Sequence, residues 1–302
     1  MSKDMFDRKQ KLVIDGEEYV ASNRIGEHEK LLASFNQLAK STYGISFQEV
    51  GGDYEPHVLI QGDKVCANVS VNQMTFFFRG KKRQYIQLGT VMTHKEYRNK
   101  GLSRLLIEQI VNQWKDKCDA IYLFANDTVL DFYPKFGFLK QEEYEYIKSN
   151  VLTPAKAQLR DLDMAVAENI KLVKEKYLEG NPFSELYMTE NDPIFSFYYE
   201  GFMKESVYYI DEYQVVVVAE EENDTMVCYD ILGKSDATLD EILSVVASYV
   251  EKQSVKLGFT PVVKEGFLCQ VHHEEDTTLF VHKDGECIME KNRIMFPMLS
   301  HA

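Results

Sequence analysis

The first half of the chain alternates between hydrophobic spacings typical of helices and of strands. Leucine and phenylalanine recur every three or four residues in 27–40, which predicts a helix. Three strand-like runs follow at 57–60, 65–78 and 84–93. Glycine-containing turn sequences separate these runs, as antiparallel hairpins require. We therefore expect a helix packed on an antiparallel sheet at the start of the chain.

The pattern continues with a strong amphipathic helix at 102–114, in which leucine, isoleucine and valine share one face with Trp114. The next predicted elements are a buried strand at 121–125, a short helix at 128–136 that ends at Gly137, and a last strand at 138–147. This order indicates the mixed α/β (α+β) class, with a mostly antiparallel sheet flanked by helices.

A linker at 148–154 suggests two domains, 1–150 and 151–302. A chain of 302 residues is long enough for two domains, each with its own core. The elements predicted for the second domain are a long helix at 155–179, strands at 207–210, 213–220 and 225–232, and a helix at 239–250. Because their order partly repeats that of the first half, we predict a second α/β domain of related architecture.

Composition narrows the possible partners. The 48 acidic and 34 basic residues give a formal net charge of −14, which opposes nucleic-acid binding because phosphates would be repelled. This charge is compatible with a cationic substrate, although solubility alone also explains it. Five scattered cysteines, a polar N-terminus and the lack of a long apolar run predict a reduced, cytoplasmic protein with no membrane partner. The oligomeric state leaves no signal in the sequence.

A basic loop containing glycine connects the predicted strand at 84–93 to the helix that follows. Its sequence is Arg98-Asn99-Lys100-Gly101-Leu102-Ser103. The start of a helix presents unpaired N–H groups and the positive end of the helix dipole, which together bind phosphate groups. Arg98 and Lys100 add positive charge, and Gly101 lets the backbone approach a ligand closely. The loop therefore predicts a pyrophosphate site.

Together with residues further along the chain, this loop resembles the GNAT N-acetyltransferase superfamily. The family hallmark is R/Q-x-x-G-x-G/A between a strand and a helix. Here it is followed by Asn126 and by Phe132-Tyr133-Pro134-Lys135-Phe136-Gly137-Phe138. The resemblance covers the first half, and its parts occur in the family's order. It implies the GNAT fold and acetyl-CoA as co-substrate, with no metal.

The resemblance also implies roles for individual residues. The basic loop would hold the pyrophosphate of CoA, and the strand before it would pair with the pantetheine amides, with one N–H polarising the thioester carbonyl. Tyr133 would be the general acid that protonates the leaving thiolate; a tyrosine that merely packs in the core is the alternative. The implied cofactor-binding residues are Val91, Met92, Thr93, Arg98, Asn99, Lys100, Gly101, Leu102, Ser103 and Asn126.

Two residues depart from the family pattern. Ser103 stands where glycine or alanine is commoner, so the last position of the loop is slightly crowded, although its hydroxyl would be able to bond a phosphate. Gln87 stands where some family members have a catalytic glutamate, and an amide cannot act as a base. The general base is therefore either another, unassigned group or an ordered water.

These residues predict an N-acetyltransferase that moves the acetyl group of acetyl-CoA to a primary amine of a small molecule or peptide. We expect direct attack by the amine and a preference for small cationic acceptors. The alternative is a non-catalytic acetyl-CoA-binding or sensing module that recruits a partner through its second half. Turnover separates the two, because a sensor would bind acetyl-CoA without releasing CoA. An acyltransferase that prefers donors with longer acyl chains is also compatible with the sequence.

The second half lacks a basic loop at the matching position. Residues 233–241 are partly acidic, so they would cap the following helix themselves and repel phosphate. We therefore predict a degenerate GNAT-like domain. The tandem arrangement resembles acetyltransferases of the enhanced-intracellular-survival type.

Two further segments carry predictions. The apolar sequence at 294–302 predicts a tail that packs into a groove. It would either bring the carboxylate of Ala302, or His301, to the cleft as a proton acceptor, or simply cover an edge strand. Residues 272–276 combine histidine with acidic residues. Because neighbouring strand residues point to opposite faces, we expect a solvated turn there and no metal site.

Overall fold

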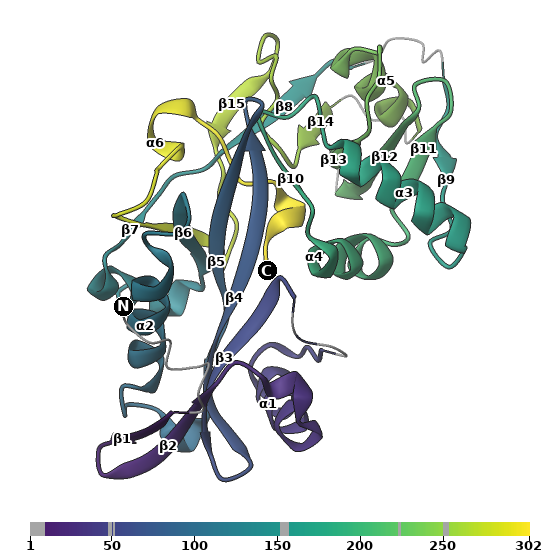
Figure 1. Ribbon diagram of the computed structural model, residues 1–302. Helices are drawn as coiled ribbons and strands as arrows, with labels where there is room; N and C mark the ends of the chain where they lie inside the picture. Colours follow the sequence, from purple (N-terminus) through teal and green to yellow (C-terminus); the bar gives the residue numbers. More distant parts are fainter. Residues whose placement is uncertain (1–9, 48–49, 51, 152–156, 223–224, 250–253) are drawn as a thin grey trace.

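The computed structural model describes residues 10–302 except 48–49, 51, 152–156, 223–224 and 250–253. Among these residues the strands form two sheets in separate parts of the molecule (Figure 1). The larger sheet is mostly antiparallel, as predicted. Its strands, in spatial order, are β1 (Lys11–Ile14), β2 (Glu17–Ser22), β3 (Tyr54–Gln61), β4 (Lys64–Phe78), β5 (Lys81–Thr93), β6 (Ala120–Ala125), β16 (Thr278–His282) and β7 (Phe138–Lys140), with β10 (Leu186–Thr189) paired to the far end of β4.

Helices α1 (Glu29–Tyr43) and α2 (Leu102–Trp114) cover opposite faces of this sheet. Neighbouring residues of β3 show the division, because Val58 packs with α1 and Leu59 packs with α2. The short helices of this region are η1 (Ile25–Glu27), η2 (Lys95–Tyr97), η3 (Asp127–Val129) and η4 (Tyr133–Phe136). The predicted helices at 27–40 and 102–114 and the strands at 57–60, 65–78, 84–93 and 121–125 are therefore confirmed.

The second sheet belongs mainly to the second half. Its strands, in spatial order, are β15 (Leu268–Val271), β8 (Tyr144–Ser149), β14 (Ser254–Leu257), β13 (Thr225–Leu232), β12 (Val215–Glu222), β11 (Val207–Ile210) and β9 (Arg160–Asp161). Alternate valines of β12 face α3 (Ala167–Glu179) on one side and α5 (Leu239–Tyr249) on the other. This accounts for its continuous run of apolar residues, since both faces are buried.

The last helices lie between the sheets and near the end of the chain. They are α4 (Asp192–Phe197), the π-helix η5 (Tyr198–Phe202), α6 (Met289–Asn292) and η6 (Met298–Ser300). The core between the sheets combines residues of both halves, including Phe76, Tyr177 and Phe195. The tail joins this core, because Phe296 is buried and stacks on Tyr122 with ring centroids 4.2 Å apart. The prediction that the tail packs into a groove is confirmed.

The two sheets exchange strands across the proposed domain boundary. β16, near the end of the chain, fills the position between β6 and β7 in the larger sheet. β8, which precedes residue 150, lies between β14 and β15 in the second sheet. A division at residue 150 therefore does not separate the two sheets.

Two element predictions are wrong. The strand expected at 138–147 is two strands, β7 and β8, because the chain leaves the larger sheet between them. Part of the helix expected at 155–179 lies outside the described residues, and the helix that is described starts only at Ala167. The segment before this helix is not helical. Its strand β9 pairs with β11, and the Asp163 carboxylate accepts the Ala165 N–H at 2.8 Å.

Candidate active site

The candidate site begins where two neighbouring strands of the larger sheet separate. β5 pairs with β6 up to Gln87, which lies opposite Tyr122, and the described residues form no β5–β6 pair beyond it. Residues 88–93 of β5 then line a cavity of about 1760 Å³, together with Phe124 and Asn126 at the end of β6. An open strand edge beside a cavity is suited to bind a ligand that carries amide groups.

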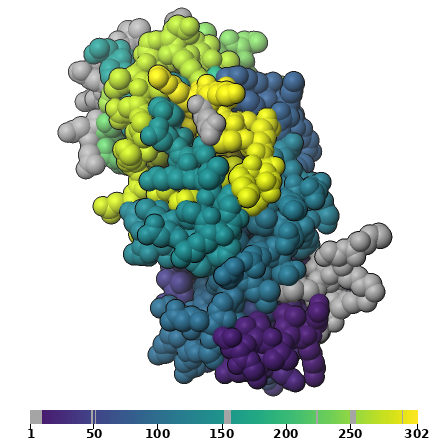
Figure 2. Space-filling model, turned by 90° about the vertical axis from the view of Figure 1, so that its left-hand side faces the viewer, coloured from purple at the N-terminus to yellow at the C-terminus, as the bar shows by residue number. Residues whose placement is uncertain are grey.

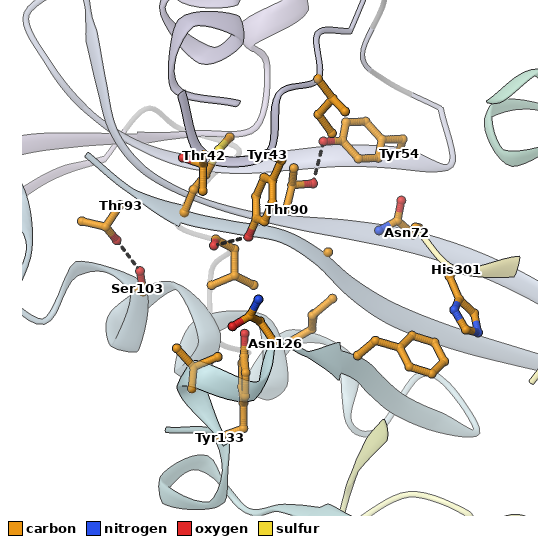
Figure 3. A pocket seen from close by; sticks show the side chains of 18 of the residues that line it. Thr42, Tyr43, Tyr54, Asn72, Thr90, Thr93, Ser103, Asn126, Tyr133 and His301 are labelled. Atoms are coloured by element: carbon orange, nitrogen blue, oxygen red, sulfur yellow. Dashed lines mark hydrogen bonds between the residues drawn. The ribbon is translucent and has the colours of Figure 1, made fainter. Parts of the chain in front are cut away.

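The cavity has two ends. Figure 3 shows Thr93 and Ser103 at one end, where β5 continues through η2 into α2. Asn72 and His301 lie at the other end, and Tyr133 lies between the two. The cavity therefore extends from the basic loop to the end of the chain.

The loop before α2 has a backbone suited to an anion. Asn99 and Gly101 are both left-handed, with φ of 64° and 74°. Gly101 is the N-cap of α2 and provides no side-chain cap, and a Cβ built on it would meet no atom within 4 Å. An uncapped helix start beside open space leaves N–H groups available to a phosphate.

Not all basic side chains of this loop line the cavity. Lys100 does not line the cavity, because its ammonium lies 3.0 Å from the Glu17 carboxylate of β2. The expectation that its side chain adds charge to the phosphate site is therefore wrong. Arg104, in the first turn of α2, lines the cavity instead, and its basic side chain at a helix start was a signal that the sequence offered. The implied residues that do line the cavity are Val91, Met92, Thr93, Arg98, Asn99, Gly101, Leu102, Ser103, Asn126 and Tyr133.

Ser103 and Thr93 join the strand to the helix. Their hydroxyls are hydrogen-bonded at 2.5 Å, and Arg98 donates from Nε to the Thr93 carbonyl at 3.3 Å. The Ser103 hydroxyl is thus engaged by β5, which gives this departure from the family pattern a structural role.

A bulge interrupts the middle of β5 where this strand lines the cavity. The register with β4 shifts at this point, and Thr90 takes a φ of 46°. Polar groups hold the bulge: Asn68 donates to the Thr90 carbonyl at 2.8 Å, and the Tyr54 and Thr90 hydroxyls lie 2.8 Å apart. The Tyr43 hydroxyl donates to the Val91 carbonyl at 2.7 Å. A ligand that pairs with this carbonyl would share it with Tyr43. The sequence did not reveal this contact between distant segments.

Tyr133 lies on the short helix η4, across the cavity from β5 (Figure 3). It is almost fully buried, and burial, with a smaller contribution from Tyr43, raises the pKa of its hydroxyl well above the ordinary value. Asn126 accepts the Thr128 N–H at 2.9 Å and so caps the adjacent η3. The hydroxyl of Tyr133 therefore stays protonated and available as a donor.

Residues 35–140 match the model of the acetyltransferase (GNAT) domain. The chain carries a GNAT acetyltransferase domain. It is an acyltransferase, and the mixed sheet flanked by helices is the fold of this family. Among curated proteins, none matches the sequence.

Solved structures of the GNAT fold cover most of the chain. A conserved protein from Enterococcus faecalis, described as a probable N-acyltransferase, matches with a TM-score of 0.59 and 12% identity over 85% of this chain and 71% of its own. A GCN5-related N-acetyltransferase from Anabaena variabilis gives 0.57 and 13%, over 87% and 72%. Eis1 from Mycobacterium abscessus gives 0.54 and 13%, over 84% and 70%. The structural likeness extends beyond residues 35–140 and includes the second half of the chain.

The far end of the cavity is formed by the second half and the tail. His301 stacks on Phe124 of the GNAT domain with ring centroids 3.8 Å apart, and its carbonyl accepts the Tyr198 hydroxyl at 2.8 Å. Burial lowers the pKa of His301 to about 4, so its imidazole is neutral near pH 7. Helix α4 contributes Asp192, Pro193, Ile194, Ser196 and Phe197 to the lining. Sequence analysis did not single out α4.

Charge is distributed unevenly along the cavity. Arg98, Arg104 and Lys135 line it on the side of the GNAT loop and η4. The acidic residues of the lining are Asp192 on α4 and Asp276, whose carboxylate accepts the Asp127 N–H of η3. The pKa of Asp53, next to the lining, is raised by burial and then by the negative charge of Asp192. The lining therefore has basic groups near the GNAT loop and η4, and acidic groups on α4 and beside η3.

The remaining sequence predictions have mixed outcomes. The residues described contain no cluster of His, Cys, Asp or Glu suited to a metal ion, and no helix among them is long and apolar enough to cross a membrane. Residues 273–276 are exposed, as expected for a solvated turn. The expectation is wrong for His272, whose largely buried side chain lies 2.9 Å from the Glu145 carboxylate. That pairing joins β8 to the segment after β15, which sequence spacing cannot show.

Proposed function

We propose that this enzyme transfers the acetyl group of acetyl-CoA to a primary amine by direct attack, and that small cationic amines are favoured. The observation that carries the proposal is one cavity that joins the basic loop, the free edge of β5 and Tyr133. Its volume of about 1760 Å³ exceeds the 300–1,000 Å³ or so of an ordinary small-molecule pocket. It has room for a long co-substrate and an acceptor together.

The residues present fit acetyl-CoA. Arg98 and Arg104 lie beside the uncapped start of α2, where a pyrophosphate is favoured by charge and by backbone N–H groups. The bulged edge of β5 would receive the pantetheine arm. The thioester supplies the activated acetyl group. A cytoplasmic location, where acetyl-CoA is made available, is part of the proposal.

Tyr133 is the proposed general acid. Its raised pKa keeps the hydroxyl protonated across the physiological range, and its ring is held by edge-to-face packing on Phe132 and Phe138. A fixed, protonated hydroxyl facing β5 is suited to give its proton to a departing thiolate.

Proton removal from the amine is assigned to the segment that lines the acceptor end of the cavity. Gln87 leaves β5 without a carboxylate, and His301 and Ala302 line the acceptor end instead. His301, which is neutral near pH 7, is the proposed proton acceptor for the amine.

The proposal is tested by CoA release from acetyl-CoA in the presence of a panel of polyamines, amino acids, peptides and neutral amines. Tyr133→Phe should keep its affinity for acetyl-CoA and lose turnover about a hundred- to ten-thousand-fold. Tyr187→Phe is the matched control, because this tyrosine stacks on Phe77 and does not line the cavity.

Two results would contradict the proposal. Unchanged turnover in Tyr133→Phe would assign the proton to another group. Binding of acetyl-CoA without CoA release for any amine would favour the sensing module instead.

A further inference from the structure

The strands of the GNAT domain separate at Gln87, and the tail meets them at that residue. The Gln87 side chain is buried. The amide orientation that satisfies its neighbours directs the oxygen to the Ala302 N–H at 2.9 Å. Its nitrogen then donates to the Ser300 carbonyl at 3.0 Å and the Tyr122 hydroxyl at 3.2 Å. One side chain therefore contacts the backbone on both sides of His301.

Gly89 gives independent evidence that the tail belongs there. Its φ is not left-handed, so its own backbone does not require glycine. A Cβ at this position would lie 2.8 Å from the Ala302 carbonyl oxygen and 3.0 Å from Asn72 Nδ2. The tail is thus a reason for the missing side chain, since a backbone atom cannot yield as a flexible side chain can.

Aromatic packing holds the tail against β6 on the way to this contact. Phe296 stacks on Tyr122 and His301 stacks on Phe124, and these two residues of β6 are on one face of the strand. Polar contacts to Gln87 then fix the last residues along the β5 side. The tail is bound to both strands at the point where they separate.

We propose that Gln87 is a positioning residue, which places residues 300–302, and with them His301, at the acceptor end of the cavity. This inference rests on the proposed function, in which the tail takes the proton from the amine. A glutamine suits the task because it offers a donor to Ser300 and an acceptor to Ala302 at once. An ionised glutamate offers only acceptors, and it would repel the Ser300 carbonyl.

The test compares Gln87→Met and Gln87→Glu with wild type, all with sequences that end at Ala302. Gln87→Met should lose kcat about a hundredfold at every pH, as expected for a misplaced catalytic group, while affinity for acetyl-CoA is unchanged. Protonated glutamate reproduces the donor and acceptor of glutamine. The kcat of Gln87→Glu, divided by that of wild type at the same pH, should therefore be near one at low pH and fall as pH rises. Dividing by the wild-type value removes the pH dependence that the two proteins share.

A second measurement reports on the tail without turnover. Carboxypeptidase should remove the last residues of Gln87→Met and Gly89→Ala faster than those of wild type, followed by intact mass. Gln84→Glu is the matched control, because this exposed amide of β5 bonds Thr75 and not the tail; it should behave as wild type in both assays. Equal trimming rates for wild type and Gln87→Met would show that Gln87 does not hold the tail in place.

The two assays separate failure of this inference from failure of the proposed function. Faster trimming with unchanged kcat would show that Gln87 holds the tail but has no part in the reaction, which overturns the positioning role. A wild-type protein that releases no CoA would remove the proposed function, and the trimming rates would still decide whether Gln87 seats the tail.

Discussion

Each half of the chain contains a strand that continues into a helix, and the two junctions are completed in opposite ways. In the GNAT domain, α2 starts on the left-handed Gly101 without a side-chain cap. In the second half, the Glu241 carboxylate accepts the Thr238 N–H at 2.9 Å, and the Thr238 hydroxyl accepts the Glu241 N–H at 3.3 Å. This capping box uses the N–H groups that a phosphate would otherwise bind. An anion site therefore needs a helix start that is left uncapped.

The space beside the second junction is also filled. The Lys234 N–H donates to the Glu179 carboxylate at 2.9 Å, and a Cβ on Gly233 would lie 2.7 Å from the Lys176 side chain. At Gly101, by contrast, a built Cβ would meet no atom within 4 Å. Side chains of α3 thus occupy the space beside the second junction.

The largest expected effect concerns the independence of the halves. Fragment 1–150 lacks β16, and fragment 151–302 lacks β8, so each loses a strand from inside its sheet and exposes the shared core. We expect neither fragment alone to show a cooperative thermal transition, and co-expression of the two to restore one. Circular dichroism during heating tests this directly. A cooperative transition in 151–302 alone would contradict it.

Sequence patterns predicted the elements whose evidence is local. The spacing of apolar residues in α2 and in β5 is set by the period of each element, so both were found. The strand exchange was not, because β16 pairs with β6 more than 150 residues away in sequence. Nothing local distinguishes the apolar residues of β7 from those of β8, although they enter different sheets.

For the site as well, the sequence predicted what is local and missed what depends on distant segments. The loop 98–103 was found because its chemistry is contiguous in sequence. Lys100 was assigned to the wrong contact, since a charge does not specify the direction of its side chain, and its partner Glu17 precedes it by 83 residues. Tyr43 and Asp192 reach the cavity from α1 and α4, and only the tertiary fold brings them there.

The next largest expected effect is on the affinity for acetyl-CoA, and it tests whether only the first junction binds the cofactor. Gly101→Val should weaken binding of acetyl-CoA to the full chain about a hundredfold, because valine strains the left-handed backbone and fills the open space. Arg98→Ala should weaken it about tenfold through the loss of one charge-assisted contact. Calorimetry should give one site per chain.

The matched control is Lys234→Ala, which removes the basic side chain beside the second junction and should leave the affinity unchanged. Two sites per chain, or wild-type affinity in both Gly101→Val and Arg98→Ala, would mean that the uncapped junction is not the cofactor site.

The smallest effect concerns the segment that connects the two sheets. Glu143 lies between β7 and β8, where it is buried and accepts the Phe296 N–H at 2.8 Å. Burial raises the pKa of its carboxyl to about 7, although the Phe296 N–H and His272 oppose the shift. The folded state therefore binds this proton more tightly than the unfolded state, whose pKa is near 4.5. Glu143 contributes stability that is complete below about pH 4.5 and is lost as the pH rises through about 7.

Glu143→Gln should remove this dependence, because an amide keeps the acceptor for Phe296 and does not ionise. The melting temperature of wild type should fall between pH 5 and 8 by an amount that corresponds to about 2 kcal/mol, and that of the variant should fall less. His272, whose pKa is raised chiefly by hydrogen bonding to Glu274, contributes in the same direction and leaves a residual slope in both proteins. Glu142→Gln changes an exposed neighbour and should follow wild type. Parallel profiles for wild type and Glu143→Gln would show that the connection between the sheets does not depend on this proton.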